Sequence, residues 1–351
     1  MVYFSNIKLN NDELSFELNN NDTIKTSFAN AIRRLIISHV PTISINEESI
    51  NFEENTSMLH NSFLSKRLAL LPINYNEINK YDINNLTFSL DRKNTDYSII
   101  SIYSGDIIVK NLNDVVSNIF IKDDILFSKL KPDQHIKFSG QFRKSNSATN
   151  GTYYTPTCKS TLSYKIDEKA LEKLDETTQK NEKERYFLKN KKDEPAVFII
   201  SIESIGMLAP MVIINSALNI LKNKLETLLD ALNKDNDEKI KLFKSDKLFE
   251  SYNFLIIDEN HTLGNLIETY LLDNENISYS GYIIPHPNDN KLLITTALQK
   301  DNTLENNKKV FINTLEKLIK INSSLIDEWG LAENSGAQKK PQTKKISIKK
   351  V

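Results

Sequence analysis

Five histidines offer the most versatile side chains for chemistry in this sequence, and one pair of them is worth testing as metal ligands. His261 and His286 each stand in a short turn-like context, HTLGN and PHP. Imidazole nitrogens bind Zn²⁺, but a zinc site needs at least one more protein ligand. The single cysteine, Cys158, and the spacing of the other histidines do not supply it. We therefore expect no metal or other cofactor in this chain, and keep a metal enzyme built on His261 and His286 as a minor alternative.

Other catalytic patterns are missing from the sequence. Neither GxGxxG nor GxxxxGK[ST], the glycine-rich loops that hold phosphates, occurs. The carboxylates are scattered over polar stretches without a persuasive pair, and Ser, Cys and His form no recognisable nucleophile arrangement. The sequence therefore predicts a protein that is not an enzyme on its own.

An adjacent pair of arginines, Arg33 and Arg34, lies at the centre of a predicted helix. Ile32 and Leu35 bracket the pair and are expected to face the core. One interpretation is two solvated cations, one of which lays its stem along apolar surface. The other is a guanidinium pair presented to an acidic or carbonyl-rich partner surface. The helix pattern alone favours the first interpretation.

The element that carries the arginines belongs to a strand–helix–strand pattern from Leu14 to Ile45. Leu14, Phe16 and Leu18 alternate with polar residues, which predicts a half-buried strand. Asp22 or Thr23 is the expected cap of the helix that follows. Pro41 should end that helix before a second strand.

The same order of elements returns from Tyr252 to Pro287. Here His261 is expected to help end a strand and Thr262 to cap the next helix. Gly264, one turn further, should let this helix approach a neighbouring backbone closely. Two similar half-domains on one chain suggest that they pair face to face, which is typical of a role in assembly rather than catalysis.

Each copy is followed by a long helix whose apolar residues recur at alternating steps of three and four. This heptad spacing favours two helices that pack against each other, although each could instead lie on its own sheet. The predicted pairing seam consists of Met211, Ile214, Leu218, Leu221, Leu225 and Leu228 in the first helix and Phe311, Leu315, Leu318, Leu325 and Trp329 in the second.

The predicted fold class is α+β. Two dimerisation units, each a sheet with a capped helix and a long heptad helix, pair within the chain as a pseudo-dimer, and the first carries a β-rich insert. The predicted domains are the first unit at 1–52 and 161–233, the insert at 53–160, a linker at 234–250, the second unit at 251–334 and a basic disordered tail at 335–351.

The charge of the chain is unevenly distributed. The net charge is -1, yet Gly336 to Val351 contains six lysines and no acid, so the remainder is acidic. Such a body lacks the basic face typical of nucleic-acid binders. A stand-alone nucleic-acid-binding protein that uses the lysine-rich tail remains an alternative. We see no signal peptide and no apolar run long enough to cross a bilayer, so we expect an intracellular protein with no membrane partner.

Several motifs resemble one protein family. NAIRRLIISHVPTISI and ENTSMLHNSFLSKRLALLPI (Glu54 to Ile73) resemble the third-largest subunit of eukaryotic RNA polymerase II, and are similar to the archaeal D subunit and, more distantly, the bacterial alpha amino-terminal domain. Ile121 to Lys144 and Ile202 to Leu225 continue the resemblance. HTLGNLIETYLL and SGYIIPHPNDNKLLI resemble the smaller partner, the eleventh subunit, called L in archaea. The chain thus resembles a fusion of two subunits, of the kind found in large DNA viruses.

The resemblance implies a non-catalytic assembly platform of a multisubunit DNA-dependent RNA polymerase. The paired halves would dock the second-largest subunit, the largest would then be recruited, and small zinc-bearing subunits would pack nearby. Asn30, Arg33 and Arg34 are nominated as contacts with the second-largest subunit. Catalytic Mg²⁺ and structural zinc would belong to other subunits, and nucleic acid would be met only through the complex. His261, Thr262, Gly264 and Asn265 are the motif residues of the second unit.

The resemblance also implies where in the cell the protein works, and the sequence departs from the family pattern at one place. It implies the host cytoplasm, in a virus factory, and the virion if the chain is viral, and the nucleus if it is cellular. Cellular third subunits often carry a cysteine cluster for zinc or iron–sulfur in the insert, but Asn74 to Leu90 contains no cysteine. Whatever rigidity that cluster would give must therefore come from packing or be lost.

Overall fold

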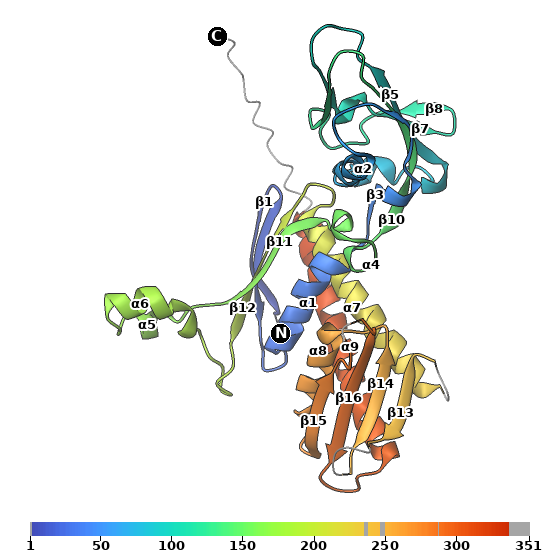
Figure 1. The fold of residues 1–351 in the computed structure, drawn as a ribbon. Coiled ribbons are helices and arrows are strands. Elements are labelled where there is room, and N and C mark those ends of the chain that lie inside the picture. Colours follow the sequence, from blue (N-terminus) through green and yellow to red (C-terminus); the bar gives the residue numbers. More distant parts are fainter. Residues whose placement is uncertain (1, 235–237, 246–249, 287, 337–351) are drawn as a thin grey trace. The chain divides into compact units, whose positions relative to one another are not determined.

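The computed structural model describes residues 2–234, 238–245, 250–286 and 288–336 (Figure 1). Pro287, parts of the predicted linker and the lysines of the predicted tail lie outside these residues. The chain divides into two compact units, each described by itself below. The first unit comprises Met1–Leu35, Thr161–Ser201 and Ile214–Val351, and the second comprises Ile36–Ser160 and Ile202–Ile213.

The N-terminal sheet of the first unit has the strand order β1–β2–β12–β11. The predicted alternation holds in β2, where Leu14, Phe16 and Leu18 are buried. The segment between β11 and β12 carries the short helices α5 and α6, which contain no buried residue within their described spans. The bounds are β1 Phe4–Asn10, β2 Glu13–Asn19, β11 Thr157–Tyr164, β12 Val197–Ser204, α5 Glu168–Leu171, α6 Glu176–Glu182 and the 3₁₀ turn η5 Lys183–Arg185.

The first copy contains helix α1 (Thr26–Ser38), and its long heptad helix is α7 (Pro210–Asn233). Helix α7 begins at Pro210, whose fixed φ suits the first helical position. The predicted cap of α1 at Asp22 or Thr23 is wrong. Asp22 and the residue before it adopt left-handed φ angles of 57° and 49° and form a turn, and the helix starts only after it. Short Asn and Asp side chains tolerate that backbone conformation, so the signal read as a cap belongs to the turn.

The second copy forms a sheet in the order β13–β14–β16–β15, also in the first unit. Strand β13 lies within the predicted linker and pairs antiparallel with β14, with Leu242 opposite Phe254. Its apolar alternation is confined to Ile240 and Leu242 among lysines, too short a pattern to indicate a strand. The bounds are β13 Ile240–Lys244, β14 Tyr252–Ile257, β15 Ile277–Ile283, β16 Lys291–Leu298, α8 His261–Leu271 and α9 Leu304–Gly336.

The second unit is built on a sheet in the order β3–β10–β5–β7–β8, with β4 also paired to β10, and on the β6–β9 pair. Strand β3, the second strand of the first copy, pairs here with β10, whereas its counterpart β15 pairs within its own copy's sheet. The compact unit that holds the predicted insert spans Ile36–Ser160 and Ile202–Ile213. Its strands are β3 Thr42–Ile45, β4 Asn51–Asn55, β5 Leu86–Lys93, β6 Ile100–Tyr103, β7 Ile108–Asn111, β8 Asp114–Val116, β9 Leu126–Leu130 and β10 His135–Ser145.

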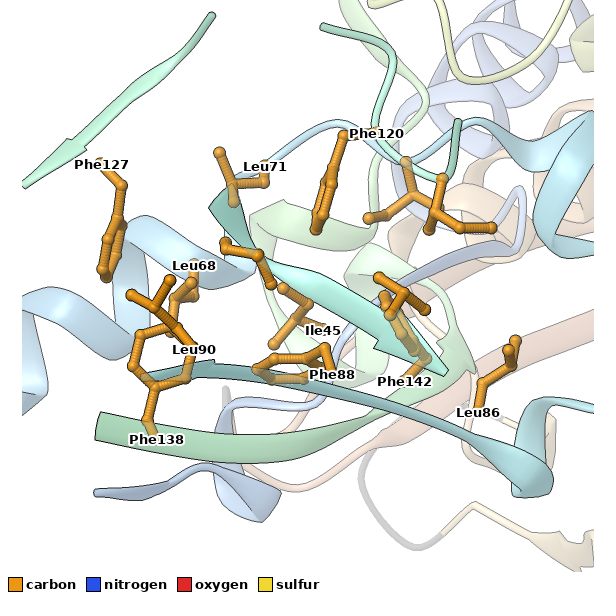
Figure 2. Packing of buried hydrophobic residues seen from close by; sticks show 14 of the residues in the cluster. Ile45, Leu68, Leu71, Leu86, Phe88, Leu90, Phe120, Phe127, Phe138 and Phe142 are labelled. Carbon is orange, nitrogen blue, oxygen red and sulfur yellow. The ribbon is translucent and has the colours of Figure 1, made fainter. Parts of the chain in front are cut away.

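Aromatic side chains fill the core of the second unit (Figure 2). Phe88 meets Phe142 edge-on at 5.5 Å and Phe138 at 6.2 Å between ring centroids. Gly140 lies opposite Phe88 in the β5–β10 register, and a Cβ there would come within 2.5 Å of the Phe88 ring. The helical segments of the unit are α2 Asn61–Ala69, α3 Tyr75–Ile78, α4 Ser147–Asn150, η1 Glu47–Ser49, η2 Ile83–Asn85, η3 Ser104–Asp106 and η4 Thr152–Tyr154.

The stretch without cysteines is held by this core. Ile78 on α3 and Leu86 and Phe88 on β5 are almost completely buried. The backbone N–H of Asn74 donates to the carbonyl of Ile119 at 2.7 Å. Apolar packing and backbone hydrogen bonds therefore fix this segment.

His135 joins three neighbouring strands of the same sheet. Its Nδ1 lies 2.8 Å from the Glu54 carboxylate on β4, and its Nε2 lies 2.7 Å from Asp91 on β5. Lys137, on the strand of His135, pairs with Glu53 and faces Asp91. The hydrogen bond to Asp91 is the main reason that the pKa of His135 is raised, Glu54 adds to it, and partial burial opposes it.

We expect the second unit to lose stability as the pH rises through the raised pKa of His135. Because the folded pKa exceeds the unfolded value of about 6.5, the stabilisation is complete below that pH and disappears when the imidazolium loses its proton. Thermal unfolding between about pH 5.5 and 8.5 measures this effect. His135→Gln keeps hydrogen bonding without the charge and should give a flatter profile. Identical pH profiles for the two proteins would contradict the expectation.

Candidate functional site

The end of helix α9 packs on the N-terminal sheet of the first copy. Trp329 on α9 is fully buried, and its ring lies 4.8 Å from Phe4 on β1 and 5.0 Å from Phe16 on β2. Next to it, the Glu328 carboxylate accepts hydrogen bonds from the backbone N–H groups of Tyr3 and Phe4 at 2.8 to 3.0 Å. A helix of the second copy thus completes both the apolar face and the end of a sheet of the first.

The two long helices meet through a buried polar contact. Asn322 on α9 is fully buried, and its Nδ2 donates to the backbone carbonyl of Leu218 on α7 at 2.8 Å. Further along, Asn215 Nδ2 donates to Glu333 at 3.1 Å. A single polar residue in an apolar seam favours one register over others, because a shifted helix would bury the amide unpaired.

The predicted seam does more than join the helices. Every seam residue is buried except Met211, which is half-buried. Phe311 stacks on Phe254 of its own copy's sheet at 4.5 Å and 22°, while Trp329 lies on the sheet of the other copy. The middle of α9 therefore faces α7 and its two ends lie on sheets, so each of the two interpretations of the heptad pattern describes part of the seam.

Helices α1 and α8 form a second contact between the copies. Phe28 on α1 meets the ring of Tyr270 on α8 edge-on at 6.3 Å. The Tyr270 hydroxyl donates to the carbonyl of Thr23 at 2.6 Å and accepts from the backbone N–H of Lys25 at 3.2 Å. Burial raises the pKa of Tyr270, so the hydroxyl stays protonated as this pattern requires. The Lys25 ammonium also pairs with Asp273 at the end of α8.

The arginine pair has different neighbours at each position. Arg34 Nε donates to Thr262 Oγ1 on α8 at 2.8 Å, which ties it to the second copy. Arg33 Nε donates to Asn30 Oδ1, one turn earlier on α1, at 2.8 Å. Partial burial, and then the charge of Arg34, lower the pKa of Arg33. The structure thus holds two half-buried cations side by side, rather than the two solvated cations that the helix pattern favours.

The motif of the second copy is placed differently from the expectation. Asn260, not Thr262, caps α8, and its side chain accepts from the N–H of Thr262. The cap prediction is wrong because an Asn two residues earlier competes for the same role, which leaves the Thr262 hydroxyl for Arg34. His261 is the exposed first residue of α8, with its ring against Tyr282.

Two asparagines at corresponding places in the copies line the same hollow. Asn30 on α1 and Asn265 on α8 border a polar depression of about 360 Å³ together with Lys25 and Thr269. Asn265 itself is exposed, and its carbonyl accepts from the Thr269 hydroxyl at 2.6 Å. The pairing of the copies therefore brings these two sequence-predicted residues to one place.

Gly264 meets side chains rather than the backbone that the sequence suggested. A Cβ at this position would lie 2.5 Å from Tyr282 Cδ2 on β15 and 2.7 Å from Leu292 Cδ1 on β16. These distances are shorter than real carbon contacts, so the helix sits on the sheet only because residue 264 has no side chain.

We expect Gly264→Ala to destabilise the first unit. Overpacking costs roughly 1–3 kcal/mol, more than the roughly 1 kcal/mol that alanine gains over glycine in a helix. Gly330→Ala on α9 is the matched control, since a Cβ there meets nothing within 4 Å, and it should be neutral or stabilising. Urea unfolding of both variants checks this, and an equally stable Gly264→Ala protein would contradict it.

The described residues contain no group of three or more His, Cys, Asp or Glu side chains placed to hold a metal ion. His286 Nδ1 accepts from the backbone N–H of Asn288 at 3.2 Å. Within the same described ranges, no helix has the length and apolar character needed to span a membrane.

Sequence reasoning missed several residues that join the copies, above all Lys224, Glu259, Tyr270 and Glu328. Each lies on a helix or loop that the pattern identified, but its partner is far away in the chain. Glu328 and Tyr3 are 325 positions apart. No local signal indicates such partners, because hydrophobic periodicity describes which face is buried and not what covers it.

These contacts join helices and sheets of the two copies within the first unit. Models of the RNA polymerase Rpb3/Rpb11 dimerisation domain match residues 20–225 and 251–328. The chain belongs to this family of RNA polymerase dimerisation domains, which confirms the predicted relation to RNA polymerase subunits.

Relatives come from eukaryotes, archaea and a virus. DNA-directed RNA polymerase II subunit rpb3 of Dictyostelium discoideum is 27% identical over 175 residues, 45% of this chain and 56% of the relative. DNA-directed RNA polymerase subunit Rpo3 of Pyrococcus horikoshii is 25% identical over 265 residues, 66% of this chain and 98% of the relative. A putative DNA-directed RNA polymerase subunit, R470 of Acanthamoeba polyphaga mimivirus, is 29% identical over 134 residues, 38% of this chain and 35% of the relative.

Proposed function

We propose that this chain is a non-catalytic assembly subunit of a multisubunit DNA-dependent RNA polymerase. In this proposal one chain supplies both halves of the dimerisation platform, as a fusion of a subunit-3-like half and a smaller partner. The observation that carries it is the pair of dimerisation domains matched on one chain, joined by α9, whose Trp329 completes the sheet of the other copy. In the proposal the two halves act together as an intramolecular pseudo-dimer.

The second-largest polymerase subunit docks, in this proposal, on the face of α1 that carries Asn30, Arg33 and Arg34. Arg33 and Arg34 are adjacent and half-buried, and partial burial, followed by the charge of Arg34, lowers the pKa of Arg33. Guanidinium groups suit carboxylate and carbonyl acceptors of the kind that a partner surface offers. The link from Arg34 to Thr262 makes this face depend on the pairing of the two copies.

The remaining parts of the proposal follow from the same role. The largest subunit joins after the second-largest, small zinc-bearing subunits lie nearby, and nucleic acid is reached only through the complex. Catalytic Mg²⁺ and structural zinc reside in those partners, and this chain holds no cofactor. The protein works inside the cell: in the host cytoplasm and the virion if it is viral, as its mimiviral relative suggests, and in the nucleus otherwise.

Affinity purification of the tagged chain from its native cell tests the function. Two very large polymerase subunits should be identified by mass spectrometry among the co-purified proteins. Arg33→Glu should reduce their recovery at least about tenfold while unfolding stays nearly unchanged, because truncating a buried charge contact costs about 2 kcal/mol or more. Arg34→Glu is a less direct test, since it also breaks the bond to Thr262.

Lys8→Glu provides the matched control, because Lys8 is an exposed cation on β1 in the same copy. It should leave recovery unchanged. Full recovery with Arg33→Glu would overturn the docking face alone. Failure of the unaltered chain to bring down either large subunit would overturn the function itself.

A further inference from the structure

A buried ion pair joins the two copies within the first unit. The Lys224 ammonium on α7 lies 3.0 and 2.9 Å from the two carboxylate oxygens of Glu259, which stands just before α8. Glu259 is 5% exposed, and the Lys224 side chain is 21% exposed. Since α7 follows the first copy and α8 belongs to the second, one partner comes from each half of the chain.

This pair is a poor source of stability. Burial raises the pKa of Glu259, and the attraction of Lys224, with a smaller contribution from Lys239, does not cancel that effect. A carboxyl whose pKa is raised on folding makes the folded state less stable at pH values where it is ionised. Two apolar side chains at these positions would give the fold at least the same stability. The two charges must therefore serve a purpose other than overall stability.

If the halves were fully symmetric, a second ion pair would join the counterpart of Lys224 on α9 to the counterpart of Glu259 before α1. Both of these counterpart positions are apolar. When the copies are aligned on Asn30 and Asn265, Ile24 stands where Glu259 stands, and Ile24 is fully buried. The two helices start at Pro210 and Leu304, and the seam alignment closest to these starts places Ile214 with Phe311. In that alignment buried Ile321 on α9 stands where Lys224 stands. The ion pair between Lys224 and Glu259 therefore has no symmetric counterpart between α9 and the segment before α1.

This asymmetry distinguishes correct from incorrect pairing. Two first halves would place Lys224 against an isoleucine, and two second halves would bury Glu259 without its lysine. A buried charge without its partner weakens a contact on the order of 100-fold or more. A mismatch of this kind is the usual means by which similar surfaces select among partners.

We propose that Lys224 and Glu259 select the partner, so that each first half pairs with a second half and not with its own kind. The inference rests on the proposed function, because it presumes that the two halves form an internal platform. Selection matters when many chains are made together. The first half of each chain is synthesised before its own second half, and pairing of like halves would link chains to one another.

The proposal is tested by letting halves with the wild-type charges compete for partners with halves in which the two charges are swapped. A protease site placed between Lys234 and Glu238, before β13, allows the purified full chain to be cut after folding. Nicked wild type and nicked Lys224→Glu/Glu259→Lys protein, the latter with a tagged first half, are mixed, unfolded in urea and refolded together. The tagged half should recover second halves of its own charge type at least about tenfold over the wild-type form. Equal recovery of both forms would overturn the proposal.

Further variants separate the possible failures. Lys224→Met/Glu259→Gln removes the charges and should pair equally with both types. Lys222→Glu, a charge reversal at a more exposed position on the same helix, should not discriminate. If the swapped chain does not refold, a wild-type tagged first half is offered wild-type and Glu259→Lys second halves, and it should exclude the latter. Halves of nicked wild type that do not co-purify would overturn the platform and not the selection.

Discussion

Trp329→Ala should cost the first unit about 3–5 kcal/mol of unfolding free energy, close to the largest effect of a single core substitution. The ring is fully buried between Phe4 and Phe16, and the cavity left behind is lined by rigid sheet that collapses poorly. The loss should appear in the N-terminal sheet although the substitution lies in the last helix. Urea unfolding followed by circular dichroism measures it.

Leu331→Ala is the control for this prediction, because Leu331 lies on the same helix and is 73% exposed. It should change the unfolding free energy by less than about 0.5 kcal/mol. Trp329 is the single tryptophan of the chain, so its fluorescence in the unaltered protein reports on this core directly. A nearly unchanged Trp329→Ala protein would mean that α9 does not stabilise the first sheet.

Phe88→Ala should have a comparable effect on the second unit, about 3–5 kcal/mol. Its ring fills the space above Gly140 and meets Phe138 and Phe142, so no flexible neighbour can replace it (Figure 2). Because Phe88 and Trp329 belong to different compact units, the fluorescence midpoint should shift far less than the dichroism midpoint.

The matched control is Tyr97→Ala, since Tyr97 in the same unit is fully exposed. It should unfold like the unaltered protein in both signals. Equal shifts of fluorescence and dichroism in Phe88→Ala would show that the two units unfold as one, and would contradict the prediction of separate cores.

Local periodicity accounts for most of the elements that the sequence predicted. Leu14, Phe16 and Leu18 identify β2, and the seam steps identify α7 and α9, because one buried face imposes its period on the chain. Local periodicity does not predict which element packs against each buried face. Strand β3 has the same alternation as a strand of the first sheet would have, yet it pairs with β10. Strand pairing depends on distant sequence, which no local pattern contains.

The candidate site shows the same limit at the level of single residues. The sequence nominated Arg34 and Thr262 separately, one as a partner contact and the other as a helix cap. Their hydrogen bond to each other follows only from the packing of α1 on α8. The ion pair of Lys224 and Glu259 gave no signal at all, because lysine and glutamate in polar surroundings resemble solvated charges.

The dependence of the N-terminal sheet on α9 has a consequence for synthesis. Phe4 and Phe16 are made before the tryptophan and glutamate that cover them, which lie more than 300 positions later in the chain. At about 5–20 residues per second, the apolar face of β1 and β2 waits on the order of tens of seconds for its cover. During that interval the nascent chain exposes a hydrophobic sheet, and cells that make this protein should need a chaperone at the ribosome to protect it.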